Sequence, residues 1–299
     1  MPALQSWRIL DFRSFVCGWG DRNRERCVMK CVVLQPPYPE KEEKAKESVT
    51  WMIEQLDAIA PGEADLILLP EYANCPGIND KKLMRDFVPS KGTDLVDALI
   101  ETAQRVNSLV ASGLVKEVSK DRWVNLTTIY DASGGRIFTY EKIHLTQFER
   151  ETLALSAGDQ ISTCEIEGVV YGFAICFDAA FPEHFVTLAK QKVDVILCPS
   201  YQRSSTPDRL DVITRARAMD TGAYMVRSSF AMPGGKTGGR SMVASPDGSL
   251  LGRLEGDAGV LRVEIDPTVK WHQPRSHGQA EIEHRELIAI ERRPELYYT

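Results

Sequence analysis

The sequence predicts an α/β fold in which mixed sheets of parallel and antiparallel strands are covered by helices. Two observations predict it: short apolar runs alternate with helical segments in the first half of the chain, and hairpin-like strand pairs follow in the second half. The 299 residues are 43% hydrophobic and 26% charged, which is enough apolar material for one large core. Because no linker, repeat or low-complexity tract divides the chain, we expect one domain over residues 29–299.

The individual elements follow from local patterns. Residues 42–60 and 93–108 carry apolar residues at the spacing of an amphipathic helix, and residues 66–69 form the short apolar run of a buried strand. The turn-forming segment Asp131-Ala-Ser-Gly-Gly135 predicts a hairpin of strands at 123–130 and 135–140. The remaining expected elements are strands at 169–175, 193–198, 223–229, 240–245 and 258–265 and helices at 182–192 and 207–222.

The first 28 residues differ in composition from the rest of the chain. They are rich in arginine, and Arg8, Asp11 and Arg13 interrupt the apolar stretch that a secretory signal would need. Strand-like sequence begins directly after Met29. We therefore assign residues 1–28 to an N-terminal extension and expect a chain that begins at Met29 to fold.

Composition also bears on partners and location. The net charge of −6 and the absence of any run of five Lys or Arg argue against nucleic acid or an anionic membrane as a partner. No segment approaches 18 consecutive apolar residues, so no membrane span is expected. The cysteine count is odd and no CxxC pair occurs, which indicates reduced thiols and a cytoplasmic location. The seven cysteines are at positions 17, 27, 31, 75, 164, 176 and 198.

Three predicted strands end in side chains that can perform chemistry. Glu71 follows an apolar strand, Lys142 closes the second strand of the hairpin, and Cys176 follows Gly172-Phe-Ala-Ile. Strand ends are common positions for sites, because loops meet a rigid sheet there. Taken singly, a glutamate or lysine at such a place is usually solvated, and an isolated cysteine usually fills the core. Their combination and order carry the functional prediction.

In this order and context, the three segments resemble the motifs of the nitrilase superfamily of carbon–nitrogen hydrolases. Leu69-Pro-Glu71 is similar to the segment with the family's catalytic glutamate, Lys142-Ile-His-Leu145 to that with its lysine, and residues 172–183 to that with its cysteine. Further similar segments lie at 215–220, 224–226, 239–242, 245–248 and 292–297, so the resemblance covers about residues 30–297. It implies a four-layer α-β-β-α sandwich and a homodimer or larger homo-oligomer, and it calls for no cofactor or metal.

The resemblance implies that Glu71, Lys142 and Cys176 are the catalytic residues. This agrees with the chemistry, because an amide carbonyl is a poor electrophile that needs a strong nucleophile and a stabilised tetrahedral intermediate. Lys142 would lower the pKa of the Cys176 thiol and face the developing oxyanion, with the backbone N–H of Phe177 as a second donor. Glu71 would accept the thiol proton, pass it to the leaving nitrogen and then activate water against the thioester.

Further residues are candidates for positioning a small-molecule amide or ureido substrate. Glu149 lies seven residues after Lys142, where related amidases carry a second active-site glutamate, and Glu151 is its nearest rival. The other candidate contacts are Phe177, Tyr72, Tyr201 and Arg203.

The substrate class follows from the nucleophile motif. Cys176-Phe-Asp178 looks like the amidase and carbamoylase branches, whereas true nitrilases typically show Cys-Trp-Glu. Relatives that act on N-carbamoyl amino acids often carry arginine just past the nucleophile, where this chain has Ala179 and Ala180. We therefore expect hydrolysis of a small neutral amide, of the omega-amidase or aliphatic-amidase kind, that releases ammonia or an amine and a carboxylic acid. The alternatives are an N-carbamoyl amidohydrolase, with Arg203 as the substrate's carboxylate clamp, a true nitrilase, and a non-catalytic binding relative.

Three other patterns have competing interpretations. A papain-like Cys/His pair would use His144 or His184 and would leave Lys142 without a role. The segment Gly234–Gly239 imitates part of a phosphate-binding loop but has Phe230 where that motif needs glycine, so we expect a loop near the mouth of the site. His272, His277 and His284 lack zinc-site spacing and are expected in a polar C-terminal segment.

Overall fold

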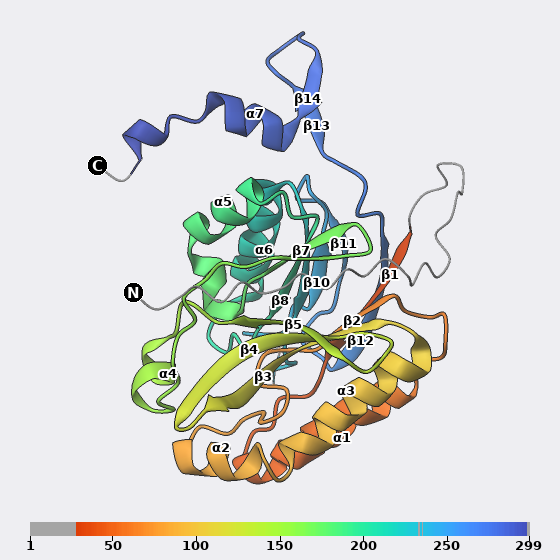
Figure 1. Cartoon of the computed structure of the whole chain (residues 1–299), viewed down its shortest axis with the longest axis vertical. Coiled ribbons are helices and arrows are strands. Elements are labelled where there is room, and N and C mark those ends of the chain that lie inside the picture. Colours follow the sequence, from red (N-terminus) through yellow and green to blue (C-terminus); the bar gives the residue numbers. More distant parts are fainter. Residues whose placement is uncertain (1–27, 233, 235, 298–299) are drawn as a thin grey trace, which may run out of the picture.

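The computed structural model describes residues 28–297 except 233 and 235, and the N-terminal extension expected at 1–28 therefore lies almost wholly outside the described residues. Two six-stranded sheets pack face to face between layers of helices (Figure 1). The first sheet has the order β12 (Gly259–Ile265), β1 (Met29–Gln35), β2 (Leu66–Leu68), β3 (Leu109–Ser119), β4 (Arg122–Tyr130) and β5 (Arg136–Glu141). The second has the order β11 (Leu250–Arg253), β10 (Met242–Ala244), β9 (Tyr224–Ser228), β8 (Val195–Pro199), β7 (Val169–Phe173) and β6 (Cys164–Ile166).

Both sheets are mixed, as the sequence predicts. In the first, β1, β2 and β3 are parallel, and antiparallel strands extend it on both sides. The second repeats this plan around parallel β7, β8 and β9. Because β2 and β7 each have a hydrogen-bonded strand on both sides, neither strand lies at an edge of its sheet.

Helices complete the predicted α-β-β-α sandwich. Helices α1 (Ala45–Asp57) and α3 (Gly92–Val106) pack on the outer face of the first sheet, where Met52, Leu56 and Leu99 are fully buried. Helices α5 (Pro182–Lys190) and α6 (Pro207–Thr221) cover the second sheet through Phe185, Leu188 and Ala218. A third core fills the space between the sheets and includes Leu68, Phe173 and Leu197. The two sheets are therefore held rigidly enough to position side chains at their edges.

The largest element that the sequence did not predict is β3. Its Ser112-Gly113 pair interrupts the apolar pattern and is typical of a loop. In the structure Gly113 is required by packing, since a Cβ there would lie 2.5 Å from the Cα of Glu71. The shorter elements not predicted are β6, β11, the 3-10 helices Cys176–Ala180 and Pro294–Leu296, helices α2 (Lys81–Phe87) and α4 (Gln147–Glu151), and the three short elements within residues 272–291.

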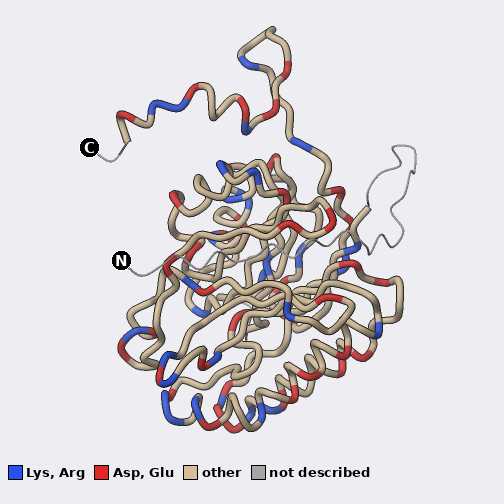
Figure 2. Tube along the Cα trace, viewed as in Figure 1, with Lys and Arg blue, Asp and Glu red and all other residues tan. Residues whose placement is uncertain are grey.

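The C-terminal segment extends away from the sandwich (Figure 1). It contains the short hairpin β13 (His272–Pro274) and β14 (Glu281–Glu283) and helix α7 (His284–Glu291), which buries none of its residues. His284 stacks on Trp271 with ring centroids 4.0 Å apart, and His272 and His277 are exposed, as expected for a polar segment. Acidic and basic residues are interspersed over the traced chain (Figure 2), and none of the described helices is long and apolar enough to cross a membrane.

Candidate active site

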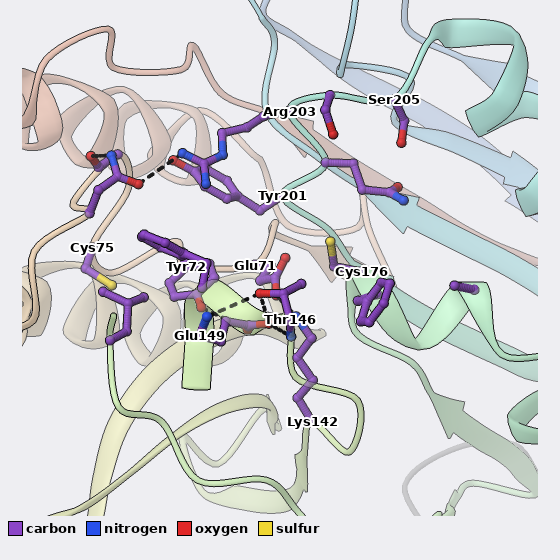
Figure 3. Close-up of a pocket in the computed structure, with 18 of the residues that line it drawn as sticks. Glu71, Tyr72, Cys75, Lys142, Thr146, Glu149, Cys176, Tyr201, Arg203 and Ser205 are labelled. Atoms are coloured by element: carbon purple, nitrogen blue, oxygen red, sulfur yellow. Dashed lines mark hydrogen bonds and ion pairs between the residues drawn. The ribbon is translucent and has the colours of Figure 1, made fainter. Parts of the chain in front are cut away.

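The structure brings Glu71, Lys142 and Cys176 together in the wall of one cavity of about 560 Å³ (Figure 3). Glu71 follows β2 by three residues, Lys142 comes directly after β5, and Cys176 begins the short turn that follows β7. The first two residues come from one sheet and the third comes from the other. The cavity therefore lies at the edge of the sandwich where strand ends of the two packed sheets meet.

Two of the turns at this edge adopt strained backbone conformations. Cys176 has φ +46° and Tyr72 has φ +59°, in the left-handed region that residues with a Cβ seldom occupy. Such strain persists only where surrounding structure imposes it, and it clusters at functional sites. In this chain it turns the Cys176 side chain off the end of a buried strand and into the cavity.

Lys142 is buried between two carboxylates. Its Nζ lies 2.7 Å from Glu71 Oε1 and 2.8 Å from each carboxylate oxygen of Glu149, and all three side chains are at most 3% exposed. Glu151, the rival candidate, is exposed and hydrogen-bonds only to Gln147 among the described residues. The geometry therefore assigns the second site glutamate to Glu149.

Both oxygens of Glu149 are engaged by donors of the protein. Besides Lys142, the Tyr72 hydroxyl donates to Oε1 at 2.9 Å, and the N–H and hydroxyl of Thr146 donate to Oε2 at 2.8 and 3.0 Å. Glu149 is also the third residue of α4 in a capping box with Thr146, which fixes the start of that helix. Glu149 therefore holds the ammonium of Lys142 in place and has little capacity left for a substrate, although the sequence predicted a direct substrate contact.

Asn125 is a site residue that the sequence analysis missed. Its side-chain amide donates to Glu71 Oε1 at 2.6 Å and to Glu149 Oε1 at 2.9 Å, so it bridges the two carboxylates. It is fully buried in β4, between apolar neighbours. An asparagine within a buried strand was the available signal, because such a side chain needs partners of its own.

The charges of the cluster depend on burial and on one another. Burial opposes the charge of Lys142, but the carboxylates of Glu71 and Glu149 raise its pKa above the ordinary value and keep it cationic. Burial, together with the Glu149 charge, raises the pKa of Glu71 even though Lys142 opposes this. Burial also opposes the ionisation of Glu149, but Lys142 and Thr146 hold its pKa below the usual range. Glu71 is thus the stronger base of the two.

The thiol differs from the sequence-based expectation. Burial, and then the nearby Glu71 carboxylate, raise the pKa of Cys176 well above its ordinary value, although Lys142 and the Tyr201 backbone act in the opposite direction. The prediction that Lys142 would lower the thiol pKa was right about the influence of that charge and wrong about the net result, because desolvation outweighs a single cation. The resting thiol is protonated, and a base must remove its proton when it reacts.

His144 and His184 belong to a structural network around Asp178. This fully buried carboxylate accepts hydrogen bonds from the Ile175 N–H at 2.8 Å, the Tyr140 hydroxyl at 2.9 Å and the His144 N–H at 3.0 Å. The His144 ring lies 2.8 Å from it, and His184 Nε2 hydrogen-bonds to the Phe173 carbonyl at 2.7 Å. A papain-like pair is not supported, because neither ring hydrogen-bonds to the thiol within the described chain.

His144, Asp178 and His184 are also close enough together to be compared with a metal site, with ligand atoms within 4.8 Å of one another. A cation there would have to displace the hydrogen bonds that already occupy both oxygens of Asp178. Burial opposes the ionisation of Asp178, but His144 and the neighbouring backbone donors hold its pKa below the usual range. Asp178 and its hydrogen-bond donors therefore link the turn at Cys176 to the segment that carries Lys142, which is a structural role.

All four predicted substrate contacts lie in the cavity wall. Tyr72 and Tyr201 pack with ring centroids 5.5 Å apart, with Arg203 next to them (Figure 3), and Phe177 also lines the cavity. Arg203 donates to Asn79 Oδ1 at 3.0 Å and lies over the ring of Tyr201. The Gly238 N–H donates to the carbonyl of the wall residue Ser205 at 3.0 Å, so the Gly238 end of the glycine-rich segment lies beside the mouth of the site.

The alanines that follow the nucleophile are not equivalent. Ala180 lines the cavity, whereas Ala179 packs in the core beneath α5 and α6 and leaves no room for substrate. A second thiol, Cys75, also lines the cavity, and Figure 3 shows it on the far side of Tyr72 from Cys176. Arg209 adds a second guanidinium to the wall, in addition to that of Arg203.

Comparison with known proteins agrees with this geometry. The Carbon-nitrogen hydrolase family matches residues 32–271. The chain is 25% identical over 260 residues to omega-amidase NIT3 of Saccharomyces cerevisiae, covering 82% of this chain and 89% of the relative, and 25% identical over 215 residues to omega-amidase NIT2 of Danio rerio, covering 68% and 76%.

Solved structures share the fold. An amidase from Nesterenkonia sp. superposes with a TM-score of 0.70 at 18% identity, covering 90% of this chain and 95% of that one. Nit3 of Saccharomyces cerevisiae, a member of branch 10 of the nitrilase superfamily, superposes with a TM-score of 0.66 at 22% identity, covering 80% and 90%. With the family match over most of its length and the same sandwich, the chain belongs to the carbon–nitrogen hydrolase family of the nitrilase superfamily.

Proposed function

We propose that the protein hydrolyses the carbon–nitrogen bond of small linear amides through a thioester on Cys176. The observation that carries this proposal is the buried Lys142 ammonium, held by two carboxylates in the wall of the cavity into which the thiol projects. A fixed cation in a desolvated cavity is suited to a developing oxyanion, and a carboxylate with a raised pKa is suited to proton transfer near neutral pH. The relatives named omega-amidase support the same reaction class.

The first half of the reaction forms the thioester. The sulfur of Cys176 attacks the amide carbonyl carbon while its proton passes to Glu71. The oxyanion of the tetrahedral intermediate faces the Lys142 ammonium and the backbone N–H of Phe177. Glu71 then protonates the leaving nitrogen, the C–N bond breaks, and ammonia or an amine departs.

The second half of the reaction hydrolyses the thioester. Glu71, again a carboxylate, takes a proton from water, and the water oxygen attacks the thioester carbon. Collapse of the second intermediate breaks the C–S bond, returns a proton to the sulfur and releases the carboxylic acid. Each group ends in its starting state, so the cycle needs only the amide and water.

A substrate screen tests the reaction class. Simple amides, N-carbamoyl compounds and nitriles of matched size are incubated with the enzyme, and ammonia release is measured. We expect the amides to give the highest kcat/KM. Faster turnover of the carbamoyl compounds would favour the ureido alternative, faster turnover of the nitriles would favour a true nitrilase, and no turnover of any class would favour a binding relative.

The wall of the cavity favours a substrate that carries a carboxylate. Arg203 and Arg209 both line it, and neither has a carboxylate within ion-pair distance among the described residues. The sequence favoured a neutral substrate because of Ala179 and Ala180, but only Ala180 reaches the cavity. We therefore propose that Arg203 takes the place of the missing arginines, the alternative that the sequence left open.

Paired kinetics test the charge preference. We expect an amide with a free carboxylate to exceed its methyl ester in kcat/KM by about 10- to 100-fold, because a charge-assisted hydrogen bond contributes roughly 1.5–3 kcal/mol. In Arg203→Gln the two substrates should become equal. A preference for the ester in the unmodified enzyme would restore the neutral-pocket interpretation.

Glu149→Gln tests the positioning of the lysine. An amide keeps the shape of the side chain but withdraws one of the two charges that hold the Lys142 ammonium, so we expect kcat to fall by about 10- to 100-fold. KM should change little, because Glu149 has no oxygen free for the substrate. Glu151→Gln is the matched control and should leave kcat unchanged, since Glu151 is exposed. If Glu151→Gln lowered kcat and Glu149→Gln did not, the positioning role would belong to Glu151 instead of Glu149.

Asp178→Asn tests the brace between the nucleophile turn and the lysine segment. One amide oxygen cannot accept all four hydrogen bonds, so we expect Cys176 to lose alignment, with kcat about ten-fold lower, KM little changed and slower alkylation of Cys176 by iodoacetamide. Asp194→Asn is the matched control, because Asp194 accepts from Val170 near the other end of β7. It should lower thermal stability and leave the alkylation rate unchanged, and equal effects of both variants would reduce Asp178 to a fold-stabilising residue.

We also propose a homodimer or larger homo-oligomer in a reducing, cytoplasmic compartment. Val212 and Met219 on α6 expose 66% and 40% of their surface, and Ile288 and Ile290 on α7 are similarly exposed. Apolar side chains grouped on outer helices favour association with another copy. All five cysteines of the described residues are free thiols, which suits a nucleophile that must stay reduced.

A further inference from the structure

A second cavity, of about 410 Å³, lies outside the catalytic one on the outer side of the first sheet. It is enclosed by α2, the start of α3 and strands β3 and β4. Its apolar lining includes Val96, Leu114 and Leu126, and the rings of Trp123 and Tyr130 complete it. Such a lining, with aromatic faces and a few polar groups, is typical of a small-molecule site.

The charged groups that line this cavity are three cations and two carboxylates. Arg85, Lys116 and Arg136 line it, and none of them has an ion-pair partner within 4.0 Å in the described part of the chain. The guanidinium of Arg85 lies 5.5 Å from the centre of the Trp123 ring, and its buried Nε has no hydrogen-bond partner among the described residues. A buried donor without a partner is costly and indicates a group that a ligand can satisfy.

Two carboxylates also reach this lining, those of Asp97 and Glu117. Glu117 accepts a hydrogen bond from the Asp121 N–H at 2.8 Å, and the three cations exceed the two carboxylates by one charge. Burial, and then repulsion from the charge of Arg136, lower the pKa of Lys116. An added anion between them would relieve this repulsion.

The two cavities are separated by the segment that follows Glu71. Tyr72 and Cys75 line the catalytic cavity, whereas Asn74 lines the second one. Asn74 is fixed there by two hydrogen bonds of 2.9 Å to the backbone of Val115 in β3. A ligand in one cavity is therefore kept out of the other by ordered main chain.

We propose that the second cavity binds a small aromatic or apolar molecule that carries one anionic group. The apolar body packs against Trp123, Leu114 and Leu126, and the anion accepts hydrogen bonds from Arg85 and pairs with Lys116 or Arg136. Arginine beside an aromatic ring suits such a ligand, because it offers a planar set of donors to a carboxylate. This site is separate from the amide hydrolysis proposed above and needs none of its residues.

Calorimetric titration of the full chain with 2-naphthoate tests the site, with 2-naphthalenemethanol as the uncharged probe. We expect naphthoate to bind at least about ten-fold more tightly than the alcohol, because a charge-assisted hydrogen bond contributes roughly 1.5–3 kcal/mol. Arg85→Gln should remove this difference by weakening naphthoate alone. Lys116→Gln, at the exposed rim, should weaken it about two- to five-fold, as exposed ion pairs contribute roughly 0.2–1 kcal/mol.

Arg203→Gln is the matched control in the catalytic cavity and should leave the affinity for naphthoate unchanged. Thermal unfolding of each variant checks that the fold is kept, and if Arg85→Gln does not fold, the double variant Lys116→Gln, Arg136→Gln takes its place with a loss of about ten-fold expected. Naphthoate binding that survives these substitutions, that is lost in Arg203→Gln, or that is absent up to millimolar concentration would overturn the proposal. Because only binding is measured, these outcomes are independent of whether the protein hydrolyses amides.

Discussion

Cys176→Ala is expected to lower kcat for amide hydrolysis by about four orders of magnitude or more. Alanine removes the only sulfur at the turn after β7, and without it neither the thioester nor the two-step route exists. Losses of a nucleophile in comparable enzymes reach this size. The fold should be unaffected, because Cys176 sits at the cavity wall and alanine fits the same backbone. Ammonia release at saturating substrate is the measurement, with thermal unfolding to check the fold.

Cys75→Ala provides the matched control, because Cys75 is a buried thiol in the wall of the same cavity. It should keep kcat within a few-fold of the unmodified enzyme. Cys75 lies on the far side of Tyr72 from Cys176 (Figure 3), so it is not placed to replace the nucleophile. Activity of Cys176→Ala above about one hundredth of the original, or a comparable loss in Cys75→Ala, would contradict the assignment of the nucleophile.

Lys142→Arg is expected to lower kcat by about 100- to 1,000-fold although it keeps the positive charge. The loss of one oxyanion donor has this magnitude. Lys142 is 1% exposed and is enclosed by Glu71, Glu149 and Asn125, so the larger planar guanidinium cannot take the position of the ammonium. Lys142→Ala should lose at least as much activity and also some stability, because it leaves two buried carboxylates without their cation, at a cost of roughly 3–5 kcal/mol.

Steady-state kinetics of the arginine variant decide the role of this lysine. Lys190→Arg, at the exposed end of α5, is the matched control and should behave as the unmodified enzyme. Near-normal turnover of Lys142→Arg would show that the residue supplies only a diffuse positive charge. A lower free energy of unfolding in Lys142→Ala than in Lys142→Arg would support the paired burial of the three charges.

Much of the architecture could be predicted from the sequence, because each element carries its own local pattern. The apolar run before Glu71, the hairpin around Asp131–Gly135 and the run before Cys176 all become strands at nearly the expected limits. β3 could not be predicted, since its Gly113 is explained by the approach of Glu71 from the turn that follows β2. The residues of the cluster were predicted because they end strands in family-like segments. Asn125 was missed because nothing adjacent to it in the sequence shows that it faces two carboxylates.

The sequence by itself determined which residue types could act and in which segments of the chain they stand. The tertiary structure alone decided how they act, because charge states and contacts depend on what surrounds each group in space. Burial between two packed sheets keeps the Cys176 thiol protonated and raises the pKa of Glu71. Donors from separate segments, Lys142 and Thr146, occupy the oxygens of Glu149. Desolvation is a property of the assembled interior, where water is excluded from several segments at once, and no single segment of the sequence specifies it.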